Sequence, residues 1–546
     1  MNYFLTYTVY VLILSVLMGI STWKLFKKMG YSPLFAFIPF YNYFIILKET
    51  KHPKWWAVLS YLPIVGPIMM SVFHIYLMKK FGKHLLQNQL LTVILPFIYM
   101  AVVNYSKDVE LEDENELFLT EEEKNAKKKD TFLGSITFAV VFATIIHVFV
   151  TQPFGIPTGS MERTLLVGDF LFVNKWSYGY RMPMRPVAIP FLQGTIMDTG
   201  QPGNPKDDPK SYVDAVKLPY TRILQFSKPQ KNDVVVFNYP QDSVHTAIDR
   251  KDPYVKRCVA TAGDTFEMRA GRLFVNGKPE TVLGDQEVQH GYLVTTGSQL
   301  DIPALYNTYG FLPVQEQQTQ TGFVYGFQGL TDKIAKEIKE LPQVIDMKEN
   351  VMPKGEASIA YRDEAKTKID TTQSIFPVNK PWNQDWYGPV RIPKKGDVVT
   401  INKETLPMYR WIISEYEHNS VAVNGEQILI NGKPETSYTI KQDYYMMVGD
   451  NRDASLDARF FGFVPEENIV GKPMFTWMSL QGAFKDSGSS YQAPFKIRWE
   501  RMFKATNTGE ANKTSYWWIA AMILILFFGW EYFVKLFRKK KTEDEL

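Results

Sequence analysis

Ser160 lies in the segment Gly-Ile-Pro-Thr-Gly-Ser-Met at 155–161, whose residue types could support nucleophilic chemistry. A serine hydroxyl attacks a carbonyl carbon only when a neighbouring base takes its proton, and histidine is the usual base. The chain has seven histidines, of which four precede Ser160 in or between apolar stretches. The other three have no acidic partner in a recognisable pattern: His245, His290 and His418. A Ser-His-Asp triad is therefore the weaker interpretation.

Lysine is the other candidate base, and Lys256 lies in the extended run 254–260, Tyr-Val-Lys-Arg-Cys-Val-Ala. The amine can accept a proton only when it is neutral, so burial must lower its pKa from about 10.4. Strand alternation would put its side chain on the same face as Tyr254 and Cys258. A lone strand lysine more often extends its amine to solvent, so spacing alone does not establish the role of a base.

The polar segment 449–464 follows a predicted apolar strand and is rich in carboxylates. Asp450, Asp453 and Asp457 could together bind calcium, but the segment lacks the glycine and the closing glutamate of an EF-hand loop. Its two arginines favour a turn crosslinked by Arg–Asp pairs. Elsewhere no cluster of histidine, cysteine or carboxylate has the spacing of metal ligands, so we expect no metal and no cofactor.

The composition limits the class of protein. A length of 546 residues predicts two to four domains, and a hydrophobic content of 45% excludes a mainly disordered chain. The single cysteine, Cys258, excludes a disulfide framework and a thiolate-rich metal site. The 61 basic and 57 acidic residues nearly balance, so we expect no nucleic acid partner.

A bilayer span needs about 20 mainly apolar residues, and five stretches reach or approach that length. They are Tyr3–Trp23, Trp55–Met78, Leu90–Val103, Phe132–Val150 and Tyr516–Val534. The first lacks a basic n-region and a cleavage site, so we interpret it as a retained anchor. The stretch Leu34–Leu47 contains a proline and an asparagine, which favours a re-entrant or interfacial segment. These stretches predict a lipid bilayer as a partner.

Basic residues flanking the spans predict the orientation, because Lys and Arg stay on the cytoplasmic side. Lys127–Lys129 precede the fourth stretch, and a basic cluster at Lys535–Lys541 follows the fifth. Both place residues 151–514 outside the cytoplasm, in a multi-pass protein of the cytoplasmic membrane. The topology over residues 30–105 stays open.

Between these last two spans, short β-branched runs predict an antiparallel β domain. The expected strands are Phe170–Asn174, Val234–Tyr239, Leu273–Val275, Val398–Ile401 and Ile428–Ile430, and only the region Thr331–Leu341 looks helical. Asn-Gly pairs at 276–277, 424–425 and 431–432 predict type I′ hairpin turns. The segment 273–280 closely repeats in 428–435, which fits a duplicated hairpin and hairpin convergence equally well.

Three ordered blocks of the chain resemble the bacterial type I signal peptidases, the membrane-bound Ser/Lys leader peptidases. The blocks are Ile-Pro-Thr-Gly-Ser-Met with Leu-Leu-Val-Gly-Asp, Tyr-Val-Lys-Arg with Ala-Gly-Asp at 262–264, and Gly-Asp-Asn-Arg-Asp-Ala-Ser-Leu-Asp-Ala-Arg with Gly-Phe-Val-Pro. The third block is the most specific. A multi-span membrane module ahead of the peptidase resembles the arrangement in some Bacteroidetes members.

The resemblance implies that Ser160 is the nucleophile and Lys256 the general base. It places Ser455 beside the lysine, with Asp457 and Arg459 as a supporting ion pair. It implies an oxyanion site formed by the Ser160 backbone N–H and the Thr158 hydroxyl. The chain departs from the family at Glu162-Arg163 and Ala458, which replace commoner residues that carry no proton in the mechanism.

The same resemblance implies cleavage of exported preproteins after small residues, at Ala-X-Ala sites, close to the secretion translocon. Apolar residues near the nucleophile would form the pocket for a methyl side chain, with the substrate docked as an added strand. The expected pocket residues are Phe154, Ile156, Met161, Leu165 and Val255.

The expected architecture is a membrane-anchored, mainly β peptidase flanked by transmembrane helices. It comprises a multi-span module at 1–105, a charged cytoplasmic linker at 106–130, an anchor helix at 131–151, a peptidase domain at 152–514 with insertions near 177–230 and 281–390, a C-terminal span at 515–535 and a basic tail at 536–546. The competing interpretation is a membrane-tethered β-rich binding or assembly module without catalysis. A self-cleaving regulator of the repressor type is disfavoured, because such proteins are soluble and carry a DNA-binding part.

Overall fold

The computed structural model describes residues 2–111, 136–196, 208–242, 244–245, 247–283, 286–362, 366–484, 494–506 and a few positions between 517 and 525. These residues form two compact units. The first comprises Met1–Gln152, Gly179–Leu224 and Ser243–Asp252, and the second comprises Pro153–Tyr178, Gln225–Asp242 and Pro253–Leu546. The expected linker at 106–130, the C-terminal span and the basic tail fall mainly or wholly outside the described residues.

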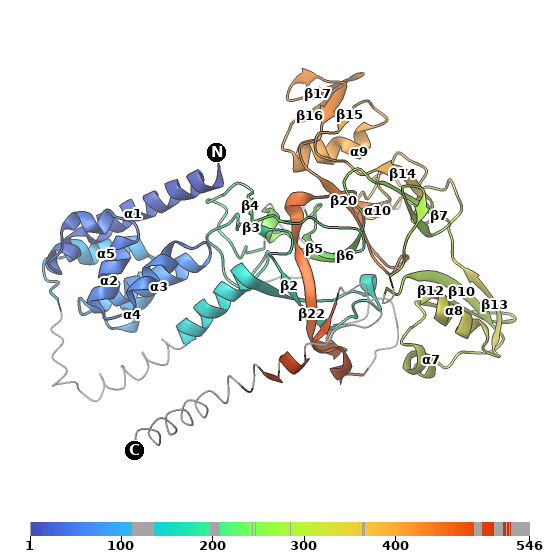
Figure 1. Cartoon of the computed structure of the whole chain (residues 1–546), viewed down its shortest axis with the longest axis horizontal. Helices are drawn as coiled ribbons and strands as arrows, with labels where there is room; N and C mark the ends of the chain where they lie inside the picture. Colours follow the sequence, from blue (N-terminus) through green and yellow to red (C-terminus); the bar gives the residue numbers. More distant parts are fainter. Residues whose placement is uncertain are drawn as a thin grey trace, which may run out of the picture. The chain divides into compact units, whose positions relative to one another are not determined.

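The described residues of the first unit up to Val150 are mainly helical (Figure 1). Its elements are α1 (Tyr3–Lys28), η1 (Pro33–Phe37), α2 (Tyr41–Glu49), η2 (Lys54–Tyr61), α3 (Val65–Lys79), α4 (Leu86–Ile94), α5 (Pro96–Tyr105) and the apolar helix Ile136–Val150. Among the described residues, only α1 is long and apolar enough to cross a bilayer. This finding fits one membrane anchor.

Two of the expected spans are not continuous helices. The stretch Trp55–Met78 divides into η2 and α3 around Ile64, whose φ is +69°. The stretch Leu90–Val103 divides at Pro96, which begins α5. Proline has no N–H to donate and clashes with the preceding turn, so the helix must end there.

Two later segments fold with the first unit. Residues 179–224, which largely coincide with the first expected insertion, include the strands β3 (Tyr180–Arg181) and β4 (Arg222–Ile223). The Tyr3 hydroxyl donates to the Pro183 carbonyl at 3.0 Å, and the Ile64 N–H donates to the Pro186 carbonyl at 2.7 Å. Long-range hydrogen bonds therefore join this segment to the helices.

The second unit is built on a nine-stranded sheet whose main path is β1-β2-β22-β5-β6-β20-β21. These strands are β1 (Thr151–Gly155), β2 (Asp169–Asn174), β22 (Ile469–Gln481), β5 (Val234–Asn238), β6 (Pro253–Ala260), β20 (Tyr444–Val448) and β21 (Val464–Pro465), with β23 (Lys496–Ile497) and β24 (Lys504–Ala505) paired to β22. Figure 1 shows β22 as the long strand between β2 and β5. The pairs β2–β22, β22–β5, β5–β6 and β6–β20 are antiparallel, as the sequence predicted.

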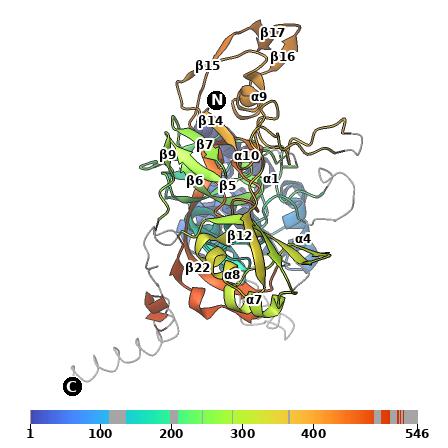
Figure 2. The same cartoon turned by 90° about the vertical axis from the view of Figure 1, so that its right-hand side faces the viewer.

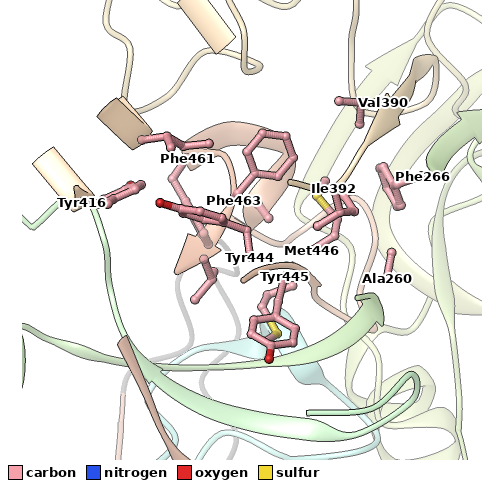
Figure 3. Packing of buried hydrophobic residues seen from close by; sticks show 14 of the residues in the cluster. Ala260, Phe266, Val390, Ile392, Tyr416, Tyr444, Tyr445, Met446, Phe461 and Phe463 are labelled. Atoms are coloured by element: carbon pink, nitrogen blue, oxygen red, sulfur yellow. The ribbon is translucent and has the colours of Figure 1, made fainter. Parts of the chain in front are cut away.

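The main hydrophobic core of this unit contains residues from β5, β6 and β20 together with later loops. Figure 3 shows Tyr444, Tyr445 and Met446 from β20 among the aromatic rings of Phe461 and Phe463. All five residues of β5 and all five of β20 are buried. Both strands are therefore buried on both faces. The alternation of buried and exposed side chains that marks a half-exposed strand is absent from them.

Smaller sheets extend from this framework. One has the order β14-β7-β8-β9 and contains β14 (Tyr387–Arg391), β7 (Thr265–Arg269), β8 (Arg272–Val275) and β9 (Lys278–Pro279). Another pairs β15 (Val398–Thr400) with β19 (Ser437–Thr439), and a third joins β16 (Val421–Asn424), β17 (Gln427–Ile430) and β18 (Lys433–Pro434). The short helices α9 (Leu406–Trp411), η8 (Ile412–Tyr416) and α10 (Ala458–Phe461) lie in the same part of the chain.

An inserted module follows β9 and has its own core. Its sheet has the order β11-β12-β10-β13 and contains β10 (Gln289–Thr296), β11 (Gln315–Thr319), β12 (Gly322–Thr331) and β13 (Val344–Glu349). Two helices, α7 (Ile302–Tyr309) and α8 (Asp332–Lys339), accompany this sheet (Figure 2). Val294, Tyr325 and Ile338 are buried in a cluster separate from the main core.

All five predicted strands are confirmed within one residue at each end. The predicted helical region is confirmed as α8, which Thr331 caps and which ends two residues before the predicted end. The expectation of a single helical region was wrong, because α7, α9 and α10 also form. Two of the three predicted type I′ turns have positive φ at both central residues. At 424–425 only Gly425 has positive φ, and Asn424 pairs with Gln427 as the last residue of β16, so the hairpin forms with a different turn.

Candidate active site

The nucleophile loop, which we define as residues 156–165, connects β1 to β2. The Ile156 N–H donates to the Asp169 carbonyl and the Gly168 N–H donates back to the Ile156 carbonyl, both at 2.9 Å. Ser160 lies in the short 3-10 helix η5 (Gly159–Met161) and is 8% exposed. The loop therefore holds Ser160 on a backbone fixed by the neighbouring strand.

Lys256 comes from the middle of β6 and meets Ser160 across 96 residues of sequence. Its Nζ lies 2.7 Å from Ser160 Oγ, at hydrogen-bonding distance, and the residue is 4% exposed. The charged amine donates to the hydroxyl, whereas a neutral amine accepts the hydroxyl proton. The structure thus brings the two candidate catalytic residues together in a buried site.

The environment of Lys256 favours the neutral amine. Burial lowers its pKa to about 8, against the opposing effect of the nearby carboxylates Asp457 and Asp450, and with some help from Arg459. The ring of Tyr254 lies 5.4 Å from Nζ on the same strand face. Strand alternation placed Lys256 on the face of Tyr254, as observed, whereas the solvent-directed amine that spacing alone favours is not found.

Asp457 and Arg459 form a fully buried ion pair. Arg459 Nε donates to Asp457 Oδ1 at 2.9 Å and its Nη2 donates to Oδ2 at 2.8 Å. The same carboxylate accepts the Gly449 N–H at 3.1 Å. Burial alone would raise the pKa of Asp457, but Arg459 and these hydrogen bonds outweigh it, so the pKa lies below its usual range.

Ser455 lies against Gly449 beside Ser160. A Cβ added to Gly449 would collide with both the Ser455 hydroxyl and the Ser160 carbonyl oxygen. The Ser455 hydroxyl is buried and makes no hydrogen bond to any described residue. The structure therefore places Ser455 at the site, without the contact to Lys256 that would identify an orienting hydroxyl.

The turn after β20 clamps the nucleophile loop. Asn451 donates from its backbone N–H to the Ser160 carbonyl and from its side chain to the Gly159 carbonyl, both at 3.2 Å. Asp450 accepts two hydrogen bonds from Arg257, at 2.7 and 2.6 Å, and one from the Thr164 hydroxyl at 2.6 Å. The predicted turn crosslinked by Arg–Asp pairs is confirmed.

Thr158 stands at the position preceding η5 with an extended backbone, and its hydroxyl makes no capping hydrogen bond. The residue is exposed. Its hydroxyl is thus not engaged in capping the helix that carries Ser160, which leaves it available for the expected oxyanion role.

The five expected pocket residues divide by exposure. Met161 and Leu165 are fully buried, and Ile156 is nearly so, in one hydrophobic cluster with Leu171 and Val234. Phe154 and Val255 remain partly exposed. Of the five, only Phe154 and Val255 are therefore partly open to solvent.

Sequence reasoning missed the roles of Gly449 and Arg257. Gly449 leaves the space into which the Ser160 carbonyl and the Ser455 hydroxyl fit, and Arg257 fixes the turn through Asp450. Both residues stand inside the blocks that carried the resemblance. The signal for Arg257 was its position next to Lys256, since a strand residue beside the base must face the opposite side.

Comparisons with known proteins agree with this geometry. The family described as signal peptidase, peptidase S26, matches residues 129–325 and 388–478, which together exceed half of the chain. A family of unknown function, DUF5684, matches residues 34–113. The first match contains Ser160, Lys256 and the polar turn at 449–459.

Several curated relatives bear the name signal peptidase I. The protein of Haemophilus influenzae is 27% identical over 412 residues, which cover 71% of this chain and 80% of the relative. The Helicobacter pylori protein is 25% identical over 378 residues, covering 68% and 92%. The Pseudomonas aeruginosa protein is 31% identical over 157 residues, covering 28% and 41%. The extent of the family match, with a buried Ser–Lys pair at its centre, shows that the chain belongs to the signal peptidases of peptidase family S26.

Proposed function

We propose that this protein acts as a signal peptidase I, a serine endopeptidase that cleaves N-terminal signal peptides from exported preproteins. The observation that carries the proposal is the 2.7 Å separation of Lys256 Nζ and Ser160 Oγ in a buried site. The lowered pKa of Lys256, about 8, supports the role of a base near neutral pH.

In the proposed mechanism, neutral Lys256 accepts the Ser160 hydroxyl proton as Oγ attacks the carbonyl carbon before the scissile bond. The tetrahedral intermediate then collapses, and Lys256 gives the proton to the departing amine of the mature protein. A water molecule, deprotonated by the same lysine, next attacks the ester. Its proton returns to Ser160 Oγ as the signal peptide leaves with a free carboxylate.

We assign the developing oxyanion to the Ser160 backbone N–H and the Thr158 hydroxyl. Two preorganised donors would stabilise the charge that appears only in the transition state. The ion pair of Asp457 and Arg459 supports the site by holding the Gly449 N–H, and Gly449 in turn touches the Ser160 carbonyl. Ser455 is proposed to face Lys256 once the substrate is bound.

The substrate backbone is proposed to add to β1. This strand ends the nine-stranded sheet and leads directly into the nucleophile loop. Phe154 and Val255 would contact the side chain before the scissile bond, above the buried floor of Ile156, Met161 and Leu165. A shallow apolar pocket accepts a methyl group and excludes larger or charged groups, which matches cleavage after Ala-X-Ala.

The proposed location is the outer face of the cytoplasmic membrane, in a multi-pass protein close to the secretion translocon. Helix α1 supplies one anchor, and the apolar segment ending at Val150 stands ten positions before Ser160. The lysines at 127–129 and 535–541 would remain in the cytoplasm. The nucleophile would then meet a cleavage site as it emerges from the bilayer.

The hydrogen-bonding contact between Lys256 and Ser160 also disfavours the competing interpretation, a non-catalytic module of the cell envelope. A binding module has no reason to bury a lysine whose main polar contact is a serine hydroxyl. Burial of a charge without a carboxylate partner is costly unless the amine becomes neutral, which is what catalysis requires.

The deciding experiment measures cleavage of a test preprotein with an Ala-X-Ala site by the detergent-solubilised full chain. We expect Ser160→Ala to abolish cleavage, while Ser414→Ala, at a partly exposed serine of η8, retains it. Cleavage by Ser160→Ala within tenfold of the wild-type rate would contradict the assignment.

A further inference from the structure

A cavity of about 790 Å³ lies between the β7–β9 hairpins and the inserted module. One wall carries Phe274, Pro279 and Val282, and the other carries residues of α7 and α8. Arg163, from the nucleophile loop, lines the same cavity. The volume is within the range of about 300–1,000 Å³ that ligand sites occupy in proteins.

The cavity is fixed to the nucleophile loop by hydrogen bonds from β10. The Gln289 side chain donates to the Glu162 carbonyl at 2.6 Å. Its backbone N–H donates to the Asp450 carbonyl and its carbonyl accepts the Arg452 N–H, both at 3.0 Å. The inserted module therefore cannot move away from Ser160 without breaking contacts to both catalytic segments.

The position of the cavity relative to the scissile bond follows from the direction in which the substrate chain would run. If substrate residues before the scissile bond lie along β1, those after it pass beyond Ser160, toward the later part of the nucleophile loop. Arg163 is three residues from Ser160, and three extended residues span at most about 11 Å. The cavity thus begins within about three to four substrate residues of the scissile bond.

The charges of the lining nearly cancel. Four basic side chains, Arg163, Arg272, Lys333 and Arg452, accompany four acidic ones, Glu280, Glu287, Asp332 and Glu337. Arg452 pairs with Glu280 at 2.8 Å, and Arg272 lies 3.6 Å from Asp332. His290 adds no charge at neutral pH, because burial and nearby arginines lower its pKa to about 3.

We propose that this cavity binds the first residues of the mature protein, on the far side of the scissile bond. The inference rests on the proposed function and assigns a part of the substrate to the inserted module. A partly apolar lining without net charge suits an extended polypeptide whose sequence varies from one preprotein to the next. It does not suit a phosphate or another ligand of fixed charge.

The test compares two preproteins with the same signal peptide and cleavage site, one ending about two residues after the site and one ending about twelve after it. We expect the wild-type chain to give a KM about fivefold lower for the longer substrate. Val282→Trp, which fills the cavity from a half-exposed wall position, should reduce this ratio to near one. Val423→Trp, at a similarly exposed position of β16, should keep it.

Equal KM values for both substrates in the wild-type chain would overturn the inference, as would a Val282→Trp variant that keeps the wild-type ratio. Absence of cleavage of both substrates by the wild-type chain would instead refute the proposed function. Thermal unfolding of the variants separates loss of structure from loss of binding.

A second pair of variants, on α8, tests the same site by changing the charge of a lysine. Lys333→Glu alters the lining, whereas Lys339→Glu changes an exposed residue of the same helix outside the lining. We expect Lys333→Glu to raise KM several-fold for a long substrate with acidic mature residues relative to one with basic residues. The same shift in Lys339→Glu would contradict the assignment.

Discussion

The hairpins at 273–280 and 428–435 have nearly the same sequence and the same local structure. Both turns have positive φ at the Asn and the Gly. The Asn276 side chain accepts the Thr265 N–H at 2.8 Å, and the Asn431 side chain accepts the Ser420 N–H at 3.0 Å. Each closing glutamate N–H, of Glu280 and Glu435, donates to the carbonyl seven residues earlier.

The hairpins differ in what lies next to them. Glu280 pairs with Arg452, which is 2% exposed and belongs to the turn that clamps the nucleophile loop. Glu435 is exposed and directly follows β18, the last strand of the three-stranded sheet β16-β17-β18. Nearly identical local sequence therefore specifies the turn and the register, but the role of each hairpin depends on its neighbours.

The largest effect is expected at Lys256, the proposed base of the site that the first hairpin contacts through Arg452. Lys256→Met should lower the rate of cleavage by about 10³-fold or more, because a positioned general base contributes roughly 10²–10⁴. The matching hairpin lysines, Lys278 and Lys433, are exposed, and their replacement by Met should change the rate less than twofold. Rates on one preprotein measure all three variants, and a large loss in either hairpin variant would contradict the contrast.

The second-largest effect is expected in the pH dependence of cleavage. Below the lowered pKa of Lys256, about 8, the neutral fraction falls tenfold for each pH unit, and kcat/KM should fall with it. Above pH 8 the amine is mostly neutral and the rate should reach a plateau. A rate that still rises tenfold per unit between pH 9 and 10 would indicate an unshifted lysine.

The closing glutamates offer a matched pair of variants. Glu280→Gln leaves the buried Arg452 without its counter-charge, which should cost about 3 kcal/mol of unfolding free energy and reduce cleavage. Glu435→Gln changes an exposed carboxylate and should cost less than about 0.5 kcal/mol. Thermal unfolding and cleavage rates measure both, and equal effects would show that the two hairpins are interchangeable.

The smallest difference is expected at the turns themselves. Asn276→Ala and Asn431→Ala should each cost about 1–2 kcal/mol, because alanine tolerates positive φ poorly and cannot accept the cross-strand N–H. Hydrogen exchange of the amides in β8 and β17 should accelerate by about tenfold in the respective variant. A difference of more than tenfold between the hairpins would show that tertiary contacts, and not the turns, hold one of them.

Much of the fold could be predicted from local sequence patterns. The β-branched runs predicted the strands, and the Asn-Gly pairs predicted the hairpins, because side-chain alternation and positive φ are local properties. Prediction was weaker for helices. The apolar stretch at 55–78 met the length of a span, yet positive φ at Ile64 divides it. Hydropathy alone does not show where an apolar stretch is divided into two helices.

The sequence by itself determined the residue types of the site: a serine after glycine, a lysine in an apolar strand and a turn rich in Asp and Arg. It could not determine that these segments meet, because Ser160, Lys256 and the turn are separated by about 100 and 200 residues, and only the order of strands in the sheet brings them together. Tertiary structure decided that burial removes water from Lys256, which lowers its pKa, and that Gly449 leaves space beside Ser160. Both effects depend on neighbours that are remote in sequence, so no local pattern encodes them.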